Sequence, residues 1–165
     1  MPRITYTSAE RDAWYSALPG VVTAAGALIT DPGGRVLLVK ANYRDDWTLP
    51  GGVCEQAEPP HAGCAREVAE ELGLHRPPGP LLAIDWSLLY GPRQRPLMHF
   101  VFDGGMLADG AGIVLQPEEL EDWRFCPDAE LGGHMTPSSL ARARAALAAR
   151  AAGAAVYLPA APVVS

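Results

Sequence analysis

The amino-acid sequence predicts a single α/β domain in which a mixed β-sheet lies between helices. Its 165 residues, 48% of them hydrophobic and 19% charged, are enough to build one domain with a substantial buried core. Apolar runs typical of strands occur with two long helical patterns, in the order strands, helix, strands, helix. We find no internal repeat. We therefore expect one domain over residues 21–153, preceded by a lead-in segment (1–20) and followed by an irregular tail (154–165).

The first part of the chain predicts a helix and a β-hairpin. The lead-in segment is polar, with a short helix expected over Ala9–Leu18, and its aromatic residues are expected to pack onto the domain or a partner chain rather than bind a ligand. Two apolar, partly β-branched runs follow, Val21–Thr30 and Arg35–Lys40, separated by the turn sequence DPGG. This pattern is typical of a hairpin. A short extended piece is expected at Trp47–Leu49.

The rest of the chain predicts two helices and further strands. A helix over Pro60–Leu72 is indicated because proline is tolerated in the first helical turn and Gly73 follows at the usual stop position. A last helix over Pro137–Ala152 has Thr136 as its cap and Gly153 at its end. Extended pieces between these helices are expected at Leu81–Leu89, Leu97–Phe102, Ile113–Leu115 and Trp123–Cys126. The glycine-rich stretch Asp103–Gly112 is expected to be either loop or irregular strand.

Charge and cysteine content narrow the class of protein. The net charge of −6 and the pI of about 5.1 argue against a general nucleic-acid or anionic-membrane surface. No apolar run approaches the ~18 residues of a membrane span, and no signal-peptide pattern is present at the N-terminus. The three cysteines lack C-x-x-C spacing, so we expect neither disulfides nor a zinc site. A cytoplasmic protein with free thiols is the resulting expectation.

The helix expected over Pro60–Leu72 has two different faces. Spacing of i, i+3, i+4 and i+7 forms an apolar stripe of Ala65, Val68, Ala69 and Leu72. Three carboxylates, those of Glu67, Glu70 and Glu71, fall on the opposite side with Arg66 beside them. Each like-charge pair costs roughly 0.2–0.5 kcal/mol on an exposed helix, so the cluster opposes folding unless a cation is nearby. Such acidic faces are often merely solvated, but oxygen ligands at this density suit Mg²⁺ or Mn²⁺.

The spacing of the whole stretch resembles the signature of the Nudix hydrolases, G-x5-E-x7-R-E-U-x-E-E-x-G-U, where U is a bulky aliphatic residue. Every specified position is met, by Gly52, Glu58, Arg66, Glu67, Val68, Glu70, Glu71, Gly73 and Leu74. The flanking segments WTLPGG and DWRFCPDAEL also look like those of Nudix domains. The resemblance implies an α/β/α sandwich and a hydrolase that acts on pyrophosphate linkages.

The resemblance also implies roles for the residues of the motif. Glu67, Glu70 and Glu71 match the carboxylates that bind Mg²⁺, or Mn²⁺ in its place, and the carbonyl of Gly51 or Gly52 completes the metal shell. Arg66 matches an arginine that orients a glutamate through a charge-assisted hydrogen bond. Glu58 is expected to support Arg66 and to have a structural role first.

The general base is less well determined by the sequence. Glu67 and Glu70 are the candidates within the motif, and Glu118, Glu119 and Glu121 are the candidates outside it. Aligning the WRF segment with the family places Glu119 where many relatives carry an additional basic or metal-binding glutamate. A solvated loop carboxylate is the alternative for Glu119.

Substrate contacts are predicted from charge and aromatic character alone. Four residues are assigned to them, namely Arg35, Lys40, Arg44 and Trp47. Trp86, Tyr90, Arg93 and Arg95 are further candidates. For the aromatic residues a place in the core or an interface is the alternative, and for the arginines a solvated surface.

Taken together, these features predict a Mg²⁺-dependent Nudix hydrolase that cleaves a nucleoside diphosphate linked to another moiety X. The substrate type stays open between a nucleoside triphosphate, a nucleotide sugar and ADP-ribose. The rival function is a Nudix-fold regulator that binds a nucleotide without cutting it. An isomerase on the same fold would need a reactive cysteine, and nothing marks Cys54 or Cys64 as reactive. The expected partner is a small nucleotide derivative, and the aromatic lead-in and the family resemblance favour a homodimer.

Overall fold

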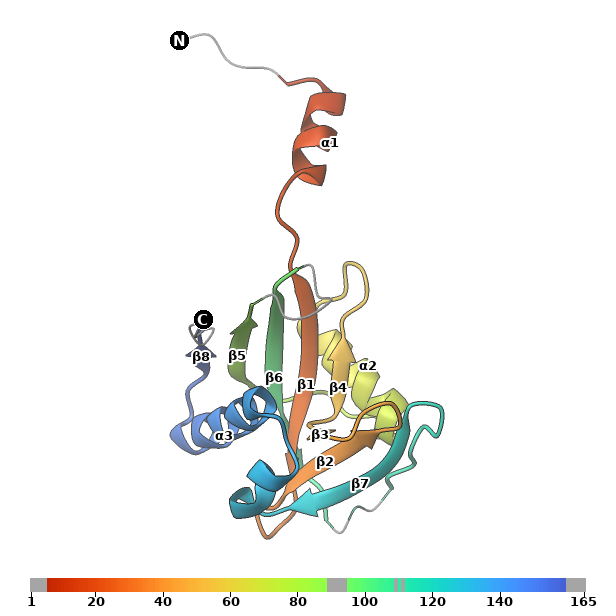
Figure 1. Ribbon diagram of the computed structural model, residues 1–165, viewed down its shortest axis with the longest axis vertical. Coiled ribbons are helices and arrows are strands. Elements are labelled where there is room, and N and C mark those ends of the chain that lie inside the picture. Colours follow the sequence, from red (N-terminus) through yellow and green to blue (C-terminus); the bar gives the residue numbers. More distant parts are fainter. Residues whose placement is uncertain (1–5, 89–94, 109, 111, 160–165) are drawn as a thin grey trace.

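A computed structural model describes residues 6–88, 95–108, 110 and 112–159, and it is an α/β/α sandwich (Figure 1). The helices are α1 (Ser8–Ser16), α2 (Pro60–Leu72) and α3 (Pro137–Ala152), with a 3₁₀ helix, η1 (Asp128–Gly133), before α3. The strands are β1 (Val22–Thr30), β2 (Val36–Ala41), β3 (Trp47–Thr48), β4 (Gly51–Val53), β5 (Leu81–Ser87), β6 (Leu97–Met106), β7 (Leu120–Cys126) and β8 (Val156–Leu158). The predicted fold class is confirmed.

The sheet is mixed and is built around β1. Its main order is β3-β2-β1-β6-β5-β8, with β4 paired to β1 and β7 paired to β2. The β1–β6 and β5–β8 pairs are parallel, whereas the other pairs are antiparallel. The predicted hairpin forms at the DPGG turn, where the Asp31 carboxylate accepts the Arg35 backbone N–H at 2.8 Å. Beyond Thr30 and Val36 the two strands separate, because β1 continues beside β4 and β6 while β2 continues beside β7.

The alternation of side chains along the strands produces two cores. On β1 and β2, Leu28 and Leu38 contribute to the core that α3 covers, whereas Ile29 and Leu37 contribute to the core that α2 covers. Successive side chains of a strand point to opposite faces, so both faces of a central strand are apolar when each is covered by a helix. The two helices therefore lie on opposite sides of the sheet (Figure 1).

The ends of α2 and α3 lie where the sequence predicts them. Pro60 and Pro137 each begin a helix, and the side chain of Thr136 accepts the Ser139 N–H at 3.3 Å. Gly73 and Gly153 end the two helices in the left-handed conformation, with φ of 68° and 69°. A residue with a Cβ would be strained at either place.

Several strand predictions need correction. The tail is not wholly irregular, because Val156–Leu158 forms β8 and pairs in parallel with β5. Residues Ile113–Leu115 form no strand, and their backbone instead bonds to the end of α2. For the glycine-rich stretch, the alternative of an irregular strand holds as far as Met106, since β6 continues to that residue with a register shift opposite Leu28 and Ile29. The predicted end of β5 at Leu89 lies outside the described residues.

Helix α1 stands apart from the sandwich (Figure 1). Thr7 caps it in a reciprocal arrangement with Glu10, but the helix has no buried residue. Trp14 and Tyr15 are exposed and contact each other edge to face, with ring centroids 4.9 Å apart. Trp14 and Tyr15 therefore do not pack onto the domain, which was one of the two expectations. The other, that they pack onto a partner chain, stays a prediction. Among the described residues, no helix has the length and apolar character needed to cross a bilayer.

Candidate active site

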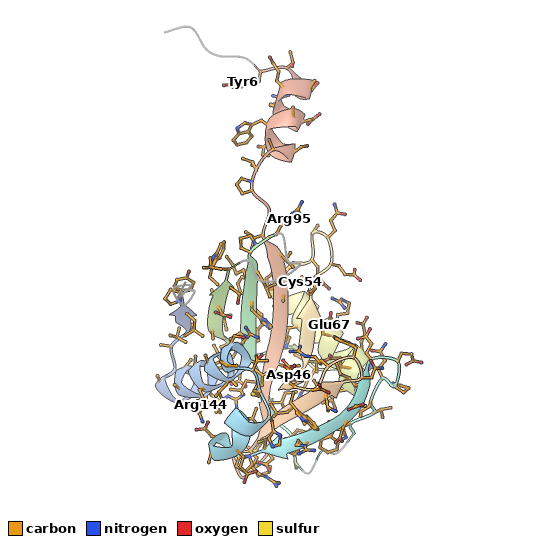
Figure 2. The ribbon with its side chains drawn as sticks, viewed as in Figure 1. Tyr6, Asp46, Cys54, Glu67, Arg95 and Arg144 are labelled. Carbon is orange, nitrogen blue, oxygen red and sulfur yellow. The ribbon has the colours of Figure 1, made fainter. Side chains whose placement is uncertain are left out.

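The site is built where β4 passes alongside α2. β4 is antiparallel to β1, with Gly51 opposite Gly26 and Gly52 opposite Ala25. A Cβ on Gly52 would lie 2.7 Å from the carboxylate atoms of Glu67. Glycine at this position therefore allows the backbone of β4 to approach the Glu67 carboxylate closely. Figure 2 shows Glu67 on the side of the molecule formed by α2 and β4, and Arg144 on the opposite side, on α3.

Glu71 is the most perturbed acid of the site. It is only 6% exposed, and its carboxylate accepts the Gly51 backbone N–H at 2.7 Å. Burial raises the pKa of Glu71 to about 8, and the charges of Glu67, Glu119 and Glu70 act in the same direction against the hydrogen bond from Gly51. The helical spacing predicts Glu71 on the face opposite the apolar stripe. In the structure Glu71 instead lies on the buried side of α2.

The buried face of α2 is shifted by about one position from the predicted stripe. Its buried residues are Gly63, Cys64, Val68, Glu71 and Leu72. Ala65 and Ala69 are only partly buried. Cys64 belongs to the core cluster with residues of β1 and β2, and Gly63 lies against Cys54 and Glu58. With this face turned inward, Glu71 is buried and Glu70 lies at the surface.

Glu67 and Glu70 differ in exposure although Arg66 contacts both. The Glu67 side chain is 13% exposed and the Glu70 side chain 50%. Burial raises the pKa of Glu67, the ion pair with Arg66 lowers it, and the charges of Glu70 and Glu119 raise it further. A raised pKa brings a carboxyl group closer to the range in which it can accept a proton near neutral pH.

Arg66 connects the acidic residues of the motif. Its Nε and one terminal nitrogen donate to the Glu58 carboxylate at 2.9 and 3.0 Å. The other terminal nitrogen lies 2.9 Å from Glu67 and 2.8 Å from Glu70. The ion pair with Glu58 raises the pKa of the Arg66 guanidinium. The predicted contact between Glu58 and Arg66 is therefore present, and Arg66 also contacts two of the three glutamates of α2.

The loop before β7 docks on the C-terminal end of α2 and carries Glu119. Val114 N–H donates to the Leu72 carbonyl at 2.9 Å, and Gln116 N–H donates to the Glu71 carbonyl at 3.2 Å. The carbonyl of Glu119 accepts the Asn42 N–H at 2.9 Å. The charge of Glu119 acts on both Glu67 and Glu71, so this exposed carboxylate lies close enough to influence the pKa of each. Of the candidates outside the motif, Glu119 is thus the one brought near the motif glutamates, whereas Glu121 pairs with Lys40.

The donor set suits a hard divalent cation. Oxygen atoms of Glu67, Glu70, Glu71 and Glu119, with backbone of Gly51 and Gly52 beside them, are the ligand type that Mg²⁺ and Mn²⁺ prefer. Burial raises the pKa of both Glu67 and Glu71, and Arg66 offsets part of this effect for Glu67, whereas among the described residues no cationic side chain does so for Glu71. The motif carboxylates do not form a tight ligand triad, because Arg66 bridges Glu67 and Glu70 while Glu71 bonds to β4.

The predicted substrate residues do not gather at this site. Arg35 pairs with Asp31 at 2.6 Å beside the DPGG turn, at the opposite end of β2 from Lys40. Lys40 pairs with Glu121, and the Arg44 Nε donates to Asp46 at 3.0 Å.

Trp47 is a correction of the sequence prediction. It is 6% exposed in the core under α3, and the Arg124 guanidinium lies 4.0 Å from its ring centroid. A buried, covered ring cannot stack on a base, so the alternative of a core position holds for Trp47. Tyr90 and Arg93, two further candidates, lie outside the described residues.

Sequence reasoning missed two features of the site. One is the hydrogen bond from Gly51 to Glu71, and the other is the docking of residues 113–119 on α2. Gly51 and Gly52 were a signal for the hydrogen bond, since adjacent glycines indicate that the backbone can approach another group closely. The second had no local signal, because the loop and the helix are far apart in the sequence.

Comparison with known proteins places this arrangement in context. The model of the NUDIX domain family matches residues 21–149. The chain is 48% identical over 90 residues to diphosphoinositol polyphosphate phosphohydrolase 2 of Rattus norvegicus, covering 54% of this chain and 42% of that protein. It is 39% identical over 75 residues to nucleoside diphosphate-linked moiety X motif 6 of Xenopus laevis, covering 42% and 35%. The chain thus matches less than half the length of either relative.

A solved structure described as UDP-X diphosphatase has a similar fold. Its TM-score is 0.71 at 22% sequence identity, and the likeness covers 93% of this chain and 76% of that chain. At this identity the comparison concerns the fold alone. It extends over more of the chain than the match to the family model.

Proposed function

The chain belongs to the NUDIX domain family, and from that premise we propose that it is a Mg²⁺-dependent hydrolase that cleaves the pyrophosphate linkage of a nucleoside diphosphate bonded to another moiety X. The substrate type is a nucleoside triphosphate, a nucleotide sugar or an ADP-ribose-like molecule. Hydrolysis at one phosphorus would release a nucleoside monophosphate and a phosphorylated X, or pyrophosphate when the substrate is a triphosphate. The name of the frog relative, nucleoside diphosphate-linked moiety X motif 6, supports this class of substrate.

One observation carries the proposal, namely that Glu67 and Glu71 are held against the glycines of β4 with raised pKa values. Buried acids of this kind occur where a cation or a proton is needed for function. Glu67, Glu70 and Glu71, with a carbonyl of Gly51 or Gly52, would hold Mg²⁺ or Mn²⁺. A divalent cation bound there supplies charge neutralisation for phosphate oxygens and a lowered pKa for a bound water.

The remaining groups of the site position the acids and accept protons. Glu58 fixes Arg66, and Arg66 keeps the carboxylates of Glu67 and Glu70 aligned. We assign the role of general base to Glu67 or to Glu119. Glu67 has a raised pKa, and Glu119 is a loop carboxylate whose charge acts on the same group. Because Glu119 comes from a loop that docks on α2, movement of that loop would alter its distance to the substrate.

The proposal is tested by assaying nucleoside diphosphate derivatives with Mg²⁺ and with a chelator. Glu70→Gln keeps the size of the side chain but removes its charge, and we expect turnover to fall by several orders of magnitude. Glu55→Gln is the matched control, since Glu55 is exposed on the preceding loop and its side chain has no part in the network. Unchanged turnover in Glu70→Gln would remove that residue from the proposed metal shell. Tight nucleotide binding without product under Mg²⁺ or Mn²⁺ would favour a binding regulator instead.

A further inference from the structure

A second group of metal-ligand side chains lies at the other end of β7. Cys126 is the last residue of that strand, Glu130 belongs to η1, and His134 follows η1 directly. Their ligand atoms, one sulfur, one carboxylate oxygen and one imidazole nitrogen, all lie within 4.8 Å of one another. In the described part of the chain, no other three His, Cys, Asp or Glu residues meet this condition. The residues follow one another at intervals of four, and only Glu130 lies within η1, so the path of the chain from β7 through η1 brings them together.

The backbone around this Cys126–Glu130–His134 cluster is fixed by hydrogen bonds. Glu130 N–H donates to the Pro127 carbonyl at 2.9 Å. The His134 carbonyl accepts the Trp47 N–H at 2.9 Å, and its ring meets the Trp47 ring edge to face with centroids 6.1 Å apart. Leu131, fully buried, anchors η1 in the core. The three ligand groups are therefore carried by ordered segments and do not need to be collected from a loose loop.

Few other protein groups occupy the ligand atoms of this cluster among the described residues. Cys126 is only 2% exposed, and its sulfur lies 3.5 Å from the Pro127 carbonyl. Among the described residues, the Glu130 carboxylate and the His134 imidazole take part in no hydrogen bond or ion pair. The ligand atoms of Glu130 and His134 are therefore available to a cation, and the Cys126 sulfur has a weak contact with the Pro127 carbonyl.

We propose that Cys126, Glu130 and His134 form a binding site for a thiophilic divalent cation of the Zn²⁺ class, with a fourth position open to water. Sulfur, nitrogen and oxygen from three side chains match the ligands that Zn²⁺ takes, and three protein ligands leave one tetrahedral position open. Mg²⁺ is not the expected ion, because it prefers oxygen ligands and keeps its waters. This proposal differs from the expectation of no zinc site, which the spacing of the cysteines suggested.

The site is separate from the carboxylates of α2. In the β2–β7 pair, Cys126 lies opposite Val36, whereas Asp122 lies opposite Lys40 at the other end of the strand. Figure 1 shows the segment between β7 and α3 on the side of the molecule away from α2. A cation held there would tie the end of β7 to the residues that immediately precede α3, and we therefore assign it a stabilising role.

The test uses Co²⁺ as a spectroscopic substitute for Zn²⁺. The full chain, reduced and stripped of metal by a chelator, is titrated with Co²⁺ in a large excess of Mg²⁺, which occupies sites made of oxygen alone. We expect one equivalent of Co²⁺ to bind with thiolate-to-cobalt charge-transfer absorption and the intense visible bands of tetrahedral cobalt, both displaced by Zn²⁺. Cys126→Ser should abolish the charge-transfer absorption, and Cys54→Ser, the matched thiol control, should retain it.

Two further variants identify the other ligands. Glu130→Gln and His134→Gln should each weaken Co²⁺ binding by at least about tenfold. Glu130 is exposed, so its variant keeps the test valid even if Cys126→Ser fails to fold. Absence of charge-transfer absorption, its persistence in Cys126→Ser, or unchanged affinity in Glu130→Gln or His134→Gln would overturn the proposal. Because no nucleotide is turned over, the result is independent of the proposed hydrolase activity.

Discussion

Replacing Glu71 with glutamine should remove a pH dependence from the free energy of unfolding. The pKa of Glu71 is raised from 4.5 to about 8 in the folded chain, so between these values the folded state keeps a proton that the unfolded state has lost. Stability falls with rising pH wherever the folded state binds more protons. Glu71 therefore destabilises the metal-free protein progressively as the pH rises from about 4.5 to 8.

The size of the effect follows from the shift. One proton difference corresponds to about 1.4 kcal/mol per pH unit, so the Glu71 contribution reaches at most about 5 kcal/mol above pH 8. Between pH 6 and pH 8 the free energy of unfolding should drop by roughly 2 kcal/mol. Glutamine has nearly the same shape, and its amide oxygen can accept the same N–H of Gly51. The Glu71→Gln variant should therefore lose the pH dependence without losing the contact.

The assay is urea unfolding in a chelator at several pH values across this window, followed by tryptophan fluorescence. At the alkaline end the variant should be more stable than the natural chain by a few kcal/mol, and at the acidic end the two should converge. Added Mg²⁺ should stabilise the natural chain more than the variant, because a cation binds the ionised carboxylate. Comparing the two proteins cancels the contribution of Glu67, whose pKa is also raised.

Two results would refute this reasoning. If the unfolding free energies of the two proteins ran parallel from pH 5 to pH 9, Glu71 would not titrate in that range in the folded state. If the natural chain became more stable as the pH rose in the chelator, the pKa of Glu71 would be lowered and not raised. Either result would mean that the carboxylate has a counter-charge in the protein itself.

Two other perturbations of the site have predictable outcomes. Gly52→Ala should displace the Glu67 carboxylate, because its Cβ would lie 2.7 Å from that group, and it should lower kcat with little loss of stability. Gly51 has φ of 137° and lies against the backbone of β1, so Gly51→Ala should lower the free energy of unfolding, measured in urea, by about 3 kcal/mol. Equal losses of stability in the two variants would contradict this. Arg66→Lys should lower activity by about 10- to 100-fold, because an ammonium group cannot bond to Glu58 and to the glutamates of α2 at once. Steady-state kinetics of this variant, with Glu58→Gln for comparison, would measure the loss. Full activity in Arg66→Lys would show that charge alone suffices.

The ends of the long helices could be predicted because their causes are local. Proline at the first helical position, a threonine cap and a glycine in the left-handed conformation act over a few residues. The bounds Pro60–Leu72 and Pro137–Ala152 are therefore confirmed residue by residue. The motif spacing lies on one of these helices, so the positions of its glutamates along α2 followed as well.

The partners of the strands could not be predicted in this way. β2 reads as one arm of a hairpin, yet most of its hydrogen-bonded length faces β7, which lies far along the chain. β8 escaped prediction because three residues in a tail rich in alanine and proline give no periodic pattern, and the strand forms only where β5 offers an unpaired edge. Pairing across long sequence separations depends on the assembled sheet and not on the local residues.

Burial of single side chains was the other gap. A helical wheel places Glu71 among exposed acids, but α2 buries Cys64 in the core under the sheet and Glu71 on the same side. Trp47 was assigned to substrate because its flat ring suits a nucleotide base, yet its position beside Met135 puts it in the core. In both cases the residue type was compatible with two environments, and only packing against distant elements decided between them.

The electrostatics of α2 indicate which acid depends most on a cation. Arg66 offsets the charges of Glu58, Glu67 and Glu70, and Glu70 is also open to water. Glu71 has neither arginine nor solvent, and the single N–H from Gly51 does not prevent a strong rise in its pKa. The apolar cores on both faces of the sheet stabilise the fold and offset the unfavourable burial of the Glu71 carboxylate. Of the motif glutamates, Glu71 should therefore show the strongest coupling between protonation, folding and metal binding.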